Sequence, residues 1–194
     1  SRQEIVRRYY DSLNALLKGN SPEEEAQKIE LLMNQANVTI EDRRVVAAAL
    51  KRAEETHTPA AALELDDGRI ITGKTSNLLG ASAALLLNVI KELAGLKHEQ
   101  HIISPESIEP IQKLKVEYLK SKNPRLHTDE VLIALSASAA SNPDARLALQ
   151  QLSKLDGCQA HTSVMLSDVD IRTFKRLGVQ LTCEAVYETG YNYH

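Results

Sequence analysis

The segment Gly68–Thr75, with the sequence GRIITGKT, is the part of the chain whose residue types most directly suggest chemistry. It matches the pattern G-x-x-x-x-G-K-[ST], in which backbone N–H groups and a lysine hold the phosphates of a nucleotide. Such a loop needs small, flexible residues, whereas three of the four residues from Arg69 to Thr72 are β-branched and favour an extended strand. Two carboxylates, Asp66 and Asp67, also precede the motif. We therefore expect a strand here and not a triphosphate-binding loop.

A smaller anion site is predicted at Gly73, Lys74, Thr75 and Ser76, directly before an apolar helix expected over Asn77–Leu93. The first N–H groups of a helix have no partner within the helix, and they favour a phosphate or carboxylate group. Lys74 would add a positive charge and the two hydroxyls would add hydrogen bonds. The alternative is that Thr75 or Ser76 caps the helix and Lys74 lies in solvent.

A second candidate site lies at the start of another predicted helix, in the stretch from Asn123 to Glu130. His127 has the right chemistry for a general acid or base, and a nearby carboxylate such as Glu130 would orient it. We take His127 and Glu130 as the candidate catalytic residues. The alternative is a well-capped helix, with Thr128 as the cap and the acidic residues of the first turn stabilised by the helix dipole.

A zinc site is the third possibility considered, with Cys158, His161 and Cys183 as ligands and His127 or His194 as the fourth. Residues three apart on a strand point to opposite faces, so Cys158 and His161 are poorly placed to share a metal. The sequence also lacks the zinc signature of deaminases, H-x-E with P-C-x-x-C. We therefore predict no metal site, and the sequence identifies no cofactor.

The composition of the chain excludes several classes of partner. It has 194 residues, 43% of them hydrophobic and 25% charged, with a net charge of -3 and both signs interleaved. A nucleic-acid-binding surface would need a basic stripe, and a membrane span would need an apolar run of about 18 residues. Neither occurs in the sequence. Two cysteines do not make a disulfide framework, so we expect a cytoplasmic protein.

Two regions are expected from the hydrophobic periodicity. The periodicity of residues 1–57 predicts three amphipathic helices, which form a helical subdomain. The chain begins inside a helical pattern, which indicates that an upstream portion of the same protein is missing. We expect this N-terminal portion to be a partner of the chain. Residues 58–194 read as an α/β domain. Its expected strands are 61–65, 69–72, 101–103, 160–166 and 179–187, and its helices are 77–93, 110–120, 128–140, 143–155 and 168–177.

This order predicts a three-layer αβα fold with a mixed, mostly parallel sheet led by a β-hairpin. The same order is similar to that of the cytidine-deaminase-like architecture, which carries no conclusion about function.

Three separate stretches resemble a bacterial family of unknown function: Thr72–Ser82, Pro124–Leu132 and Gly157–Val164. The resemblance as a whole extends over essentially the entire chain. The family is the domain of unknown function 1846, also called uncharacterised protein family 0371. The resemblance is to the C-terminal part of longer bacterial proteins. It implies no established activity and no assigned functional residues.

Two hypotheses about function follow, and the sequence leaves open whether the protein is an enzyme. In the first, the chain is part of an enzyme that binds a small anionic ligand, a phosphorylated or carboxylate metabolite, near Lys74. In the second, it is a structural or oligomerisation domain that packs on the missing N-terminal portion or on another copy of itself.

Overall fold

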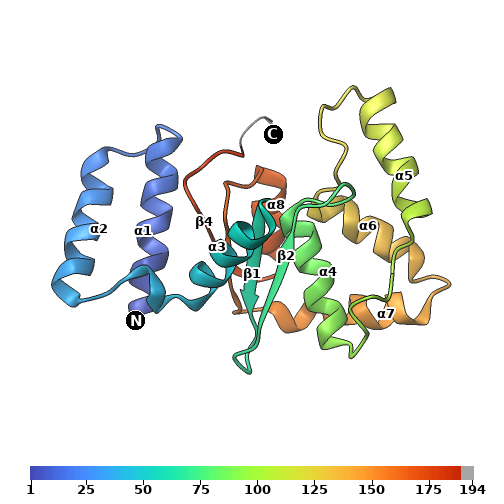
Figure 1. Cartoon of the computed structure of the whole chain (residues 1–194), viewed down its shortest axis with the longest axis horizontal. Coiled ribbons are helices and arrows are strands. Elements are labelled where there is room, and N and C mark those ends of the chain that lie inside the picture. The colour runs from blue at the N-terminus through green and yellow to red at the C-terminus, as the bar shows by residue number, and fades with distance from the viewer. Residues whose placement is uncertain (189–194) are drawn as a thin grey trace.

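Eight α-helices and one four-stranded sheet lie within residues 1–188, the part of the chain that the computed structural model describes. Helices α1 (Arg2–Leu17) and α2 (Glu23–Ala36) form an antiparallel hairpin at one end of the molecule (Figure 1). Their apolar faces bury a small core of their own, which one residue of α3 joins: Val6, Tyr10, Ile29, Met33, Val38 and Val46.

The sheet has the strand order β2-β1-β3-β4, and its strands are β1 (Ala60–Glu64), β2 (Ile70–Lys74), β3 (Gln159–Thr162) and β4 (Gln180–Cys183). The expected hairpin of β1 and β2 is confirmed. The prediction of a mostly parallel sheet is wrong, because β3 pairs with β1 in antiparallel register and only β3 and β4 run parallel. The fold class is therefore mixed α/β with a mostly antiparallel sheet.

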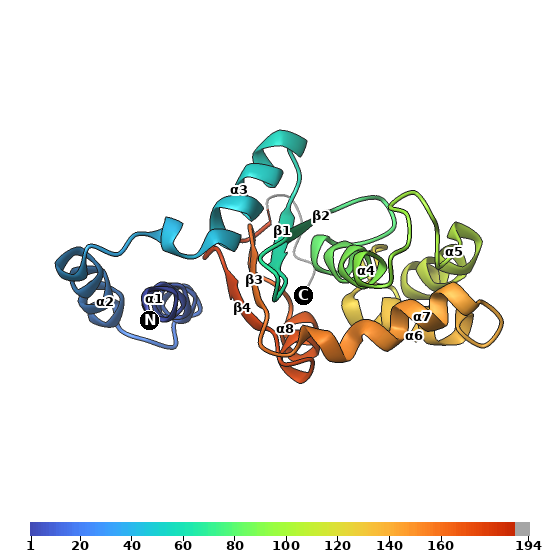
Figure 2. The same cartoon turned by 90° about the horizontal axis from the view of Figure 1, so that it is seen from below.

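Helices cover both faces of this sheet (Figure 2). Successive side chains of a strand point to opposite faces, and β1 shows this directly. Ala62 packs against Val45 and Ala49 of α3 (Arg44–Thr56), whereas Ala61 and Leu63 belong to the main core with α4. No strand occurs in residues 1–57, but α3 packs on the sheet, so the division of the chain at residue 57 stays a prediction.

The buried helix α4 (Ala81–Leu93) begins four residues later than expected. Residues 76–79 form a tight turn instead, in which the Ser76 N–H donates to the Leu79 carbonyl and the Ser76 hydroxyl accepts from Leu78 and Leu79 N–H groups. Leu79 then pairs with Leu126 in an isolated parallel bridge. These bonds hold the backbone away from helical geometry until Gly80.

The expected strand at 101–103 is also wrong, since these residues form a bend whose Ile102 and Ile103 side chains are buried in the main core. Three helices lie beyond it at the far end of the molecule (Figure 1): α5 (Pro105–Lys113), which continues as a π-helical turn (Leu114–Tyr118), then α6 (Thr128–Ser138) and α7 (Pro143–Gln150). Helix α8 (Asp168–Arg176) joins β3 to β4. No helix within residues 1–188 is long and apolar enough to cross a membrane.

Candidate functional site

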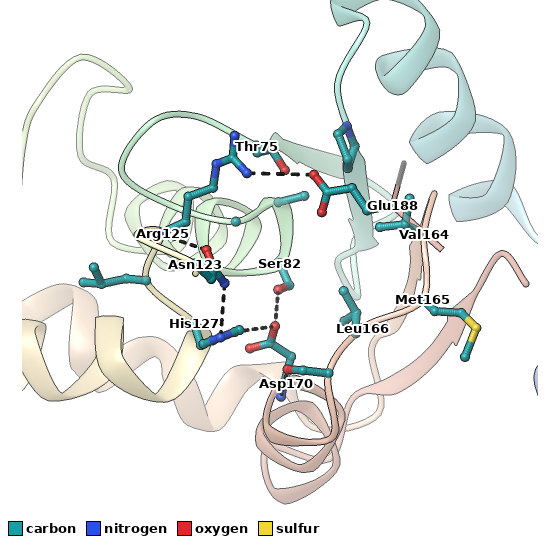
Figure 3. Close-up of a pocket in the computed structure, with 15 residues that line it drawn as sticks. Thr75, Ser82, Asn123, Arg125, His127, Val164, Met165, Leu166, Asp170 and Glu188 are labelled. Carbon is teal, nitrogen blue, oxygen red and sulfur yellow. Dashed lines mark hydrogen bonds and ion pairs between the residues drawn. The ribbon is translucent and has the colours of Figure 1, made fainter. Parts of the chain in front are cut away.

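A small cavity lies beyond the carboxyl end of β3, where the N-terminal ends of three helices meet (Figure 3). Gly80, Ala81 and Ser82 contribute the start of α4, and His127 precedes α6. Ser167 and Asp170 belong to the start of α8. The cavity volume is about 70 Å³. The other lining residues are Pro59, Thr75, Asn123, Arg125, Leu126, Val164, Met165, Leu166 and Glu188.

Asp170 is the centre of the hydrogen bonds that join these three helices. Its carboxylate accepts from the Thr128 N–H at 2.9 Å and from the Thr128 hydroxyl at 2.7 Å. It also accepts from the Ser82 hydroxyl at 3.2 Å, and its second oxygen lies 3.5 Å from Nδ1 of His127 (Figure 3). Asp170 is therefore a buried carboxylate with a donor from each of the two neighbouring helix starts.

The pair of His127 and Asp170 alters the acidity of both side chains. The hydrogen bond to Asp170 raises the pKa of His127 above its ordinary value, against the opposite effect of burial. Burial raises the pKa of Asp170, but the hydrogen bonds from His127 and Thr128 outweigh it, and the pKa lies below the ordinary value of an aspartate. Asp170 is therefore ionised at neutral pH, and it favours the imidazolium form of His127.

The other ring nitrogen of His127 contacts Asn123. Nε2 of His127 lies 3.3 Å from Nδ2 of the buried Asn123, whose Oδ1 accepts from the Arg125 N–H at 3.0 Å. In the neutral ring with Nδ1–H directed at Asp170, Nε2 accepts from the Asn123 amide; in the imidazolium form Nε2 is itself a donor. A ligand that accepts a proton or a hydrogen bond from His127 must therefore displace this amide.

Two groups at the cavity have unused hydrogen-bonding capacity. Helix α4 has no side-chain cap, since its N-cap residue is Gly80. The N–H groups of Ala81 and Ser82 have no hydrogen-bond acceptor within residues 1–188. The second group is the hydroxyl of Thr75. Thr75 is only 7% exposed and lines the cavity, and its hydroxyl makes no hydrogen bond within the described part of the chain.

The structure brings together only some of the site residues predicted from the sequence. Thr75 and His127 line the cavity, although they come from different predicted sites. Lys74 is exposed at the end of β2 and does not line the cavity. Gly73 is buried under α4, where a Cβ would meet the Leu85 N atom at 2.3 Å. The Ser76 side chain is exposed, and its hydroxyl is used in the turn before α4.

Glu130 does not line the cavity but holds the backbone beside it. Its carboxylate accepts from the His127 N–H at 2.8 Å and from the ammonium of the buried Lys115 at 2.8 Å. His127, not Thr128, is therefore the N-cap residue of α6. Glu130 and Lys115 fix the start of α6, which positions the His127 ring.

Sequence reasoning missed Asp170, Ser82 and Asn123. Asp170 lies in the first turn of a predicted helix, where an acidic residue is ordinarily explained by the helix dipole. Nothing local to residue 170 indicates that its partners lie at 82 and 127–128, about 90 and 40 residues away in the sequence, respectively. Only the tertiary fold brings them together.

The three residues considered for zinc are spread through the sheet. His161 is fully buried, with Nδ1 2.7 Å from the Thr182 hydroxyl and Nε2 3.3 Å from Glu184. Cys158 is buried near Asp66, and burial raises its pKa to about 11. In residues 1–188 no group of three or more His, Cys, Asp or Glu side chains is arranged to hold a metal ion. His194 lies outside the described residues.

Comparison with known proteins identifies the family. Residues 41–193 match the family described as "Domain of unknown function DUF1846, C-terminal". A UPF0371 protein of Corynebacterium efficiens is 54% identical over 188 residues, which are 97% of this chain and 38% of that protein. A UPF0371 protein of Streptococcus uberis is 48% identical over the same shares of the two chains. The chain therefore belongs to the DUF1846 family, and it spans about two fifths of the length of these relatives.

Proposed function

We propose that this member of the DUF1846 family binds a small phosphorylated or carboxylate metabolite through its anionic group, in the cavity at the start of α4. The observation that carries the proposal is that the uncapped first turn of α4, the unpaired Thr75 hydroxyl and the imidazole of His127 all border one cavity. Helix N-termini and histidinium side chains both stabilise negative charge.

The size of the cavity favours one anionic group over a whole nucleotide. Its volume is about 70 Å³, whereas pockets that enclose a drug-sized ligand measure roughly 300–1,000 Å³. A second hollow of about 550 Å³ shares Pro59, Thr75 and Arg125 with it and extends toward α3. The rest of the ligand would lie in that hollow.

His127 gives the site its chemistry in this proposal. An anion that displaces the Asn123 amide from Nε2 would accept a hydrogen bond from His127, while Asp170 stays on Nδ1. The same pair can transfer a proton to or from a bound substrate, which is the acid–base role expected of a histidine oriented by a carboxylate. Lys74 has no part in it, because its exposed side chain lies outside the cavity.

The proposal is tested by giving α4 a carboxylate cap of its own. Gly80 has φ -68° and ψ 164°, the extended geometry of an N-cap, and the nearest atom to a Cβ there is 4.0 Å away. In Gly80→Asp the new carboxylate accepts from the free N–H groups and occupies the place of the ligand anion. We expect inorganic phosphate, titrated by NMR on the His127 ring signals, to bind the native protein and to lose at least roughly tenfold in affinity for the variant.

A matched pair of variants completes this test. Thr75→Val removes the hydroxyl but keeps the shape, and it should weaken phosphate binding several-fold. Lys74→Ala should leave it unchanged. The proposal fails if phosphate does not bind the native protein, or if Gly80→Asp folds normally and binds phosphate as well as the native protein does.

The structural or oligomerisation function is the second candidate, and exposed apolar side chains favour it. The π-helical turn after α5 and the residue after it expose four large apolar side chains, of which Tyr118 and Leu119 are 68% and 67% exposed. Such a surface in solution favours association. Sedimentation of the native protein and of Tyr118→Glu tests this function: an oligomer dissociated by the substitution supports it, and a monomer contradicts self-association.

A further inference from the structure

We infer that the cleft between α1 and the β4–α8 edge of the molecule is a second ligand site, which takes an organic carboxylate with an apolar body. The cleft has a volume of about 500 Å³, within the range of small-molecule sites. It lies where the α1–α2 hairpin meets the α/β part, and such junctions commonly hold ligands. This inference does not depend on the anion cavity, although Met165 and Leu166 line both.

The floor of the cleft is apolar. Leu166 and Ile171 are half-buried there, and Val179 and Cys183 are buried. An apolar ligand body removes the remaining surface of these side chains from water, which stabilises the complex in proportion to the area covered.

The edge of the sheet adds main-chain groups that are not paired. The N–H groups of Gln180 and Glu184 donate to Cys158, directly before β3, and to Thr162 of β3. The main-chain groups of Leu181 and Cys183 therefore point the other way, toward α1. Asn14 of α1 donates to the Cys183 carbonyl at 2.7 Å. The N–H of Leu181 has no acceptor within residues 1–188, and a carboxylate oxygen would satisfy it.

The charges around the cleft select an anion. Lys18, directly after α1, and Lys175 of α8 border it from opposite sides, and neither makes an ion pair in the described part of the chain. Arg7 also borders it but is paired with Glu4 and Asp11. Asp11 is the one carboxylate among the lining residues described, so positive charge predominates.

The two walls are held at a fixed spacing. Besides the bond from Asn14, the Tyr10 hydroxyl of α1 donates to Glu184 at 3.0 Å. These bonds fix α1 against the end of β4, so the cleft is formed before a ligand arrives.

The test uses decanoate as the probe and decyltrimethylammonium, with an equal alkyl chain and the opposite charge, as its control. Calorimetric titration of the purified protein should show decanoate binding at one site and no binding of the cation. The double variant Lys18→Glu/Lys175→Glu should weaken decanoate binding roughly tenfold, since two weak attractions become repulsions. Lys28→Glu, an exposed lysine of α2 away from the cleft, should change nothing.

A variant that fills the cleft separates this site from the anion cavity. Ala15→Trp puts a large ring on the α1 wall, and it should abolish decanoate binding while phosphate binding in the anion cavity stays unchanged. Thermal unfolding shows whether each variant is folded. The inference is overturned if decanoate does not bind, if the cation binds equally well, or if the folded double variant and Ala15→Trp both bind decanoate like the native protein.

Discussion

Asp170 is the residue on which the polar structure of the anion cavity depends. It is 6% exposed, and its carboxylate accepts hydrogen bonds from Ser82 and Thr128 and pairs with His127. A buried carboxylate is stable only when donors surround it, and here the donors come from the starts of two other helices. The same side chain therefore controls the relative positions of three helices and the protonation of His127.

Replacing Asp170 by asparagine should lower the pKa of His127. The hydrogen bond to the carboxylate is the largest cause of the raised pKa, so its loss leaves burial as the main influence, which acts in the opposite direction. NMR titration of the His127 ring signals measures the change. Asp168→Asn, an exposed position in the same first turn, is the control. An unchanged pKa in Asp170→Asn would contradict the pairing.

The raised pKa of His127 also fixes the sign of its contribution to stability. A histidine with a raised folded-state pKa stabilises the protein fully below its unfolded pKa of about 6.5, and the contribution is lost as the pH rises through the folded-state pKa. The stability difference between the native protein and Asp170→Asn from this source should therefore shrink as the pH rises above about 6.5.

Gly73 shows why a glycine in a motif can be misread. The sequence places it in a phosphate-binding pattern, where glycine lets the backbone approach a ligand. In the fold it lets α4 approach β2, because a Cβ at 73 would lie 2.3 Å from Leu85 N and 2.6 Å from Leu85 Cα. Both uses require the missing side chain, so the sequence alone does not distinguish them.

Gly73→Ala should therefore destabilise the protein by roughly 1–3 kcal/mol or more, as overpacking against a helix backbone does. Chemical denaturation measures the free energy of unfolding. Gly80→Ala is the comparison, because a Cβ there has 4.0 Å of clearance, and only the smaller cost of a poorer helix cap applies. Equal losses in both variants would argue against close packing at 73.

At the scale of elements, the hairpin and the helices could be predicted from local sequence patterns, whereas the direction in which β3 pairs with β1 could not. The turn residues Asp66, Asp67 and Gly68 indicate the hairpin, and most helices begin within a few residues of their expected starts. The direction of β3 relative to β1 depends on how the chain returns over almost 100 residues, and no local pattern encodes it. The alternation of strands and helices favoured a parallel arrangement that only β3 and β4 adopt.

Arg43, the residue directly before α3, joins this helix to β3 and β4. It is fully buried, and its guanidinium donates to the Ala160 and Gln180 carbonyls at 2.8 Å each and to the Thr182 hydroxyl at 3.2 Å. Gln159 accepts a further hydrogen bond. Burial lowers the pKa of Arg43 to about 10, so the side chain is still charged at neutral pH.

Arg43→Met keeps the apolar stem of this side chain and removes every donor. We expect it to cost at least roughly 3 kcal/mol, since several buried acceptors lose a donor and each such loss costs about 1–3 kcal/mol. The neighbouring Arg44→Met removes an exposed ion pair with Glu64 and should cost less than about 1 kcal/mol. Unfolding free energies of the two variants within error of each other would contradict this role for Arg43.

At the scale of the whole molecule, a small polar cluster attaches the α1–α2 hairpin to the α/β part. Its members are Tyr10 of α1, His161 of β3 and Glu184, which follows β4. The Tyr10 ring packs on the His161 ring with centroids 4.7 Å apart, and the Glu184 carboxylate accepts from Tyr10 and lies 3.3 Å from His161.

This attachment should weaken in acid, because His161 resists protonation in the folded state. Burial lowers the pKa of His161 more than the hydrogen bond with Glu184 raises it. Below the unfolded pKa of about 6.5 the unfolded state binds a proton that the folded state does not, so stability falls as the pH falls from there toward the folded-state pKa. Local release of α1 from β4 also frees His161 to take the proton, so the hairpin should loosen before the rest of the molecule opens.

Hydrogen-exchange protection factors, corrected for intrinsic exchange, should fall in α1 between pH 7 and pH 5 more than in α4, and His161→Gln should remove that difference. The effect has the opposite sign to that of His127, so equal changes in α1 and α4, or a difference that persists in His161→Gln, would show that His161 does not control the attachment.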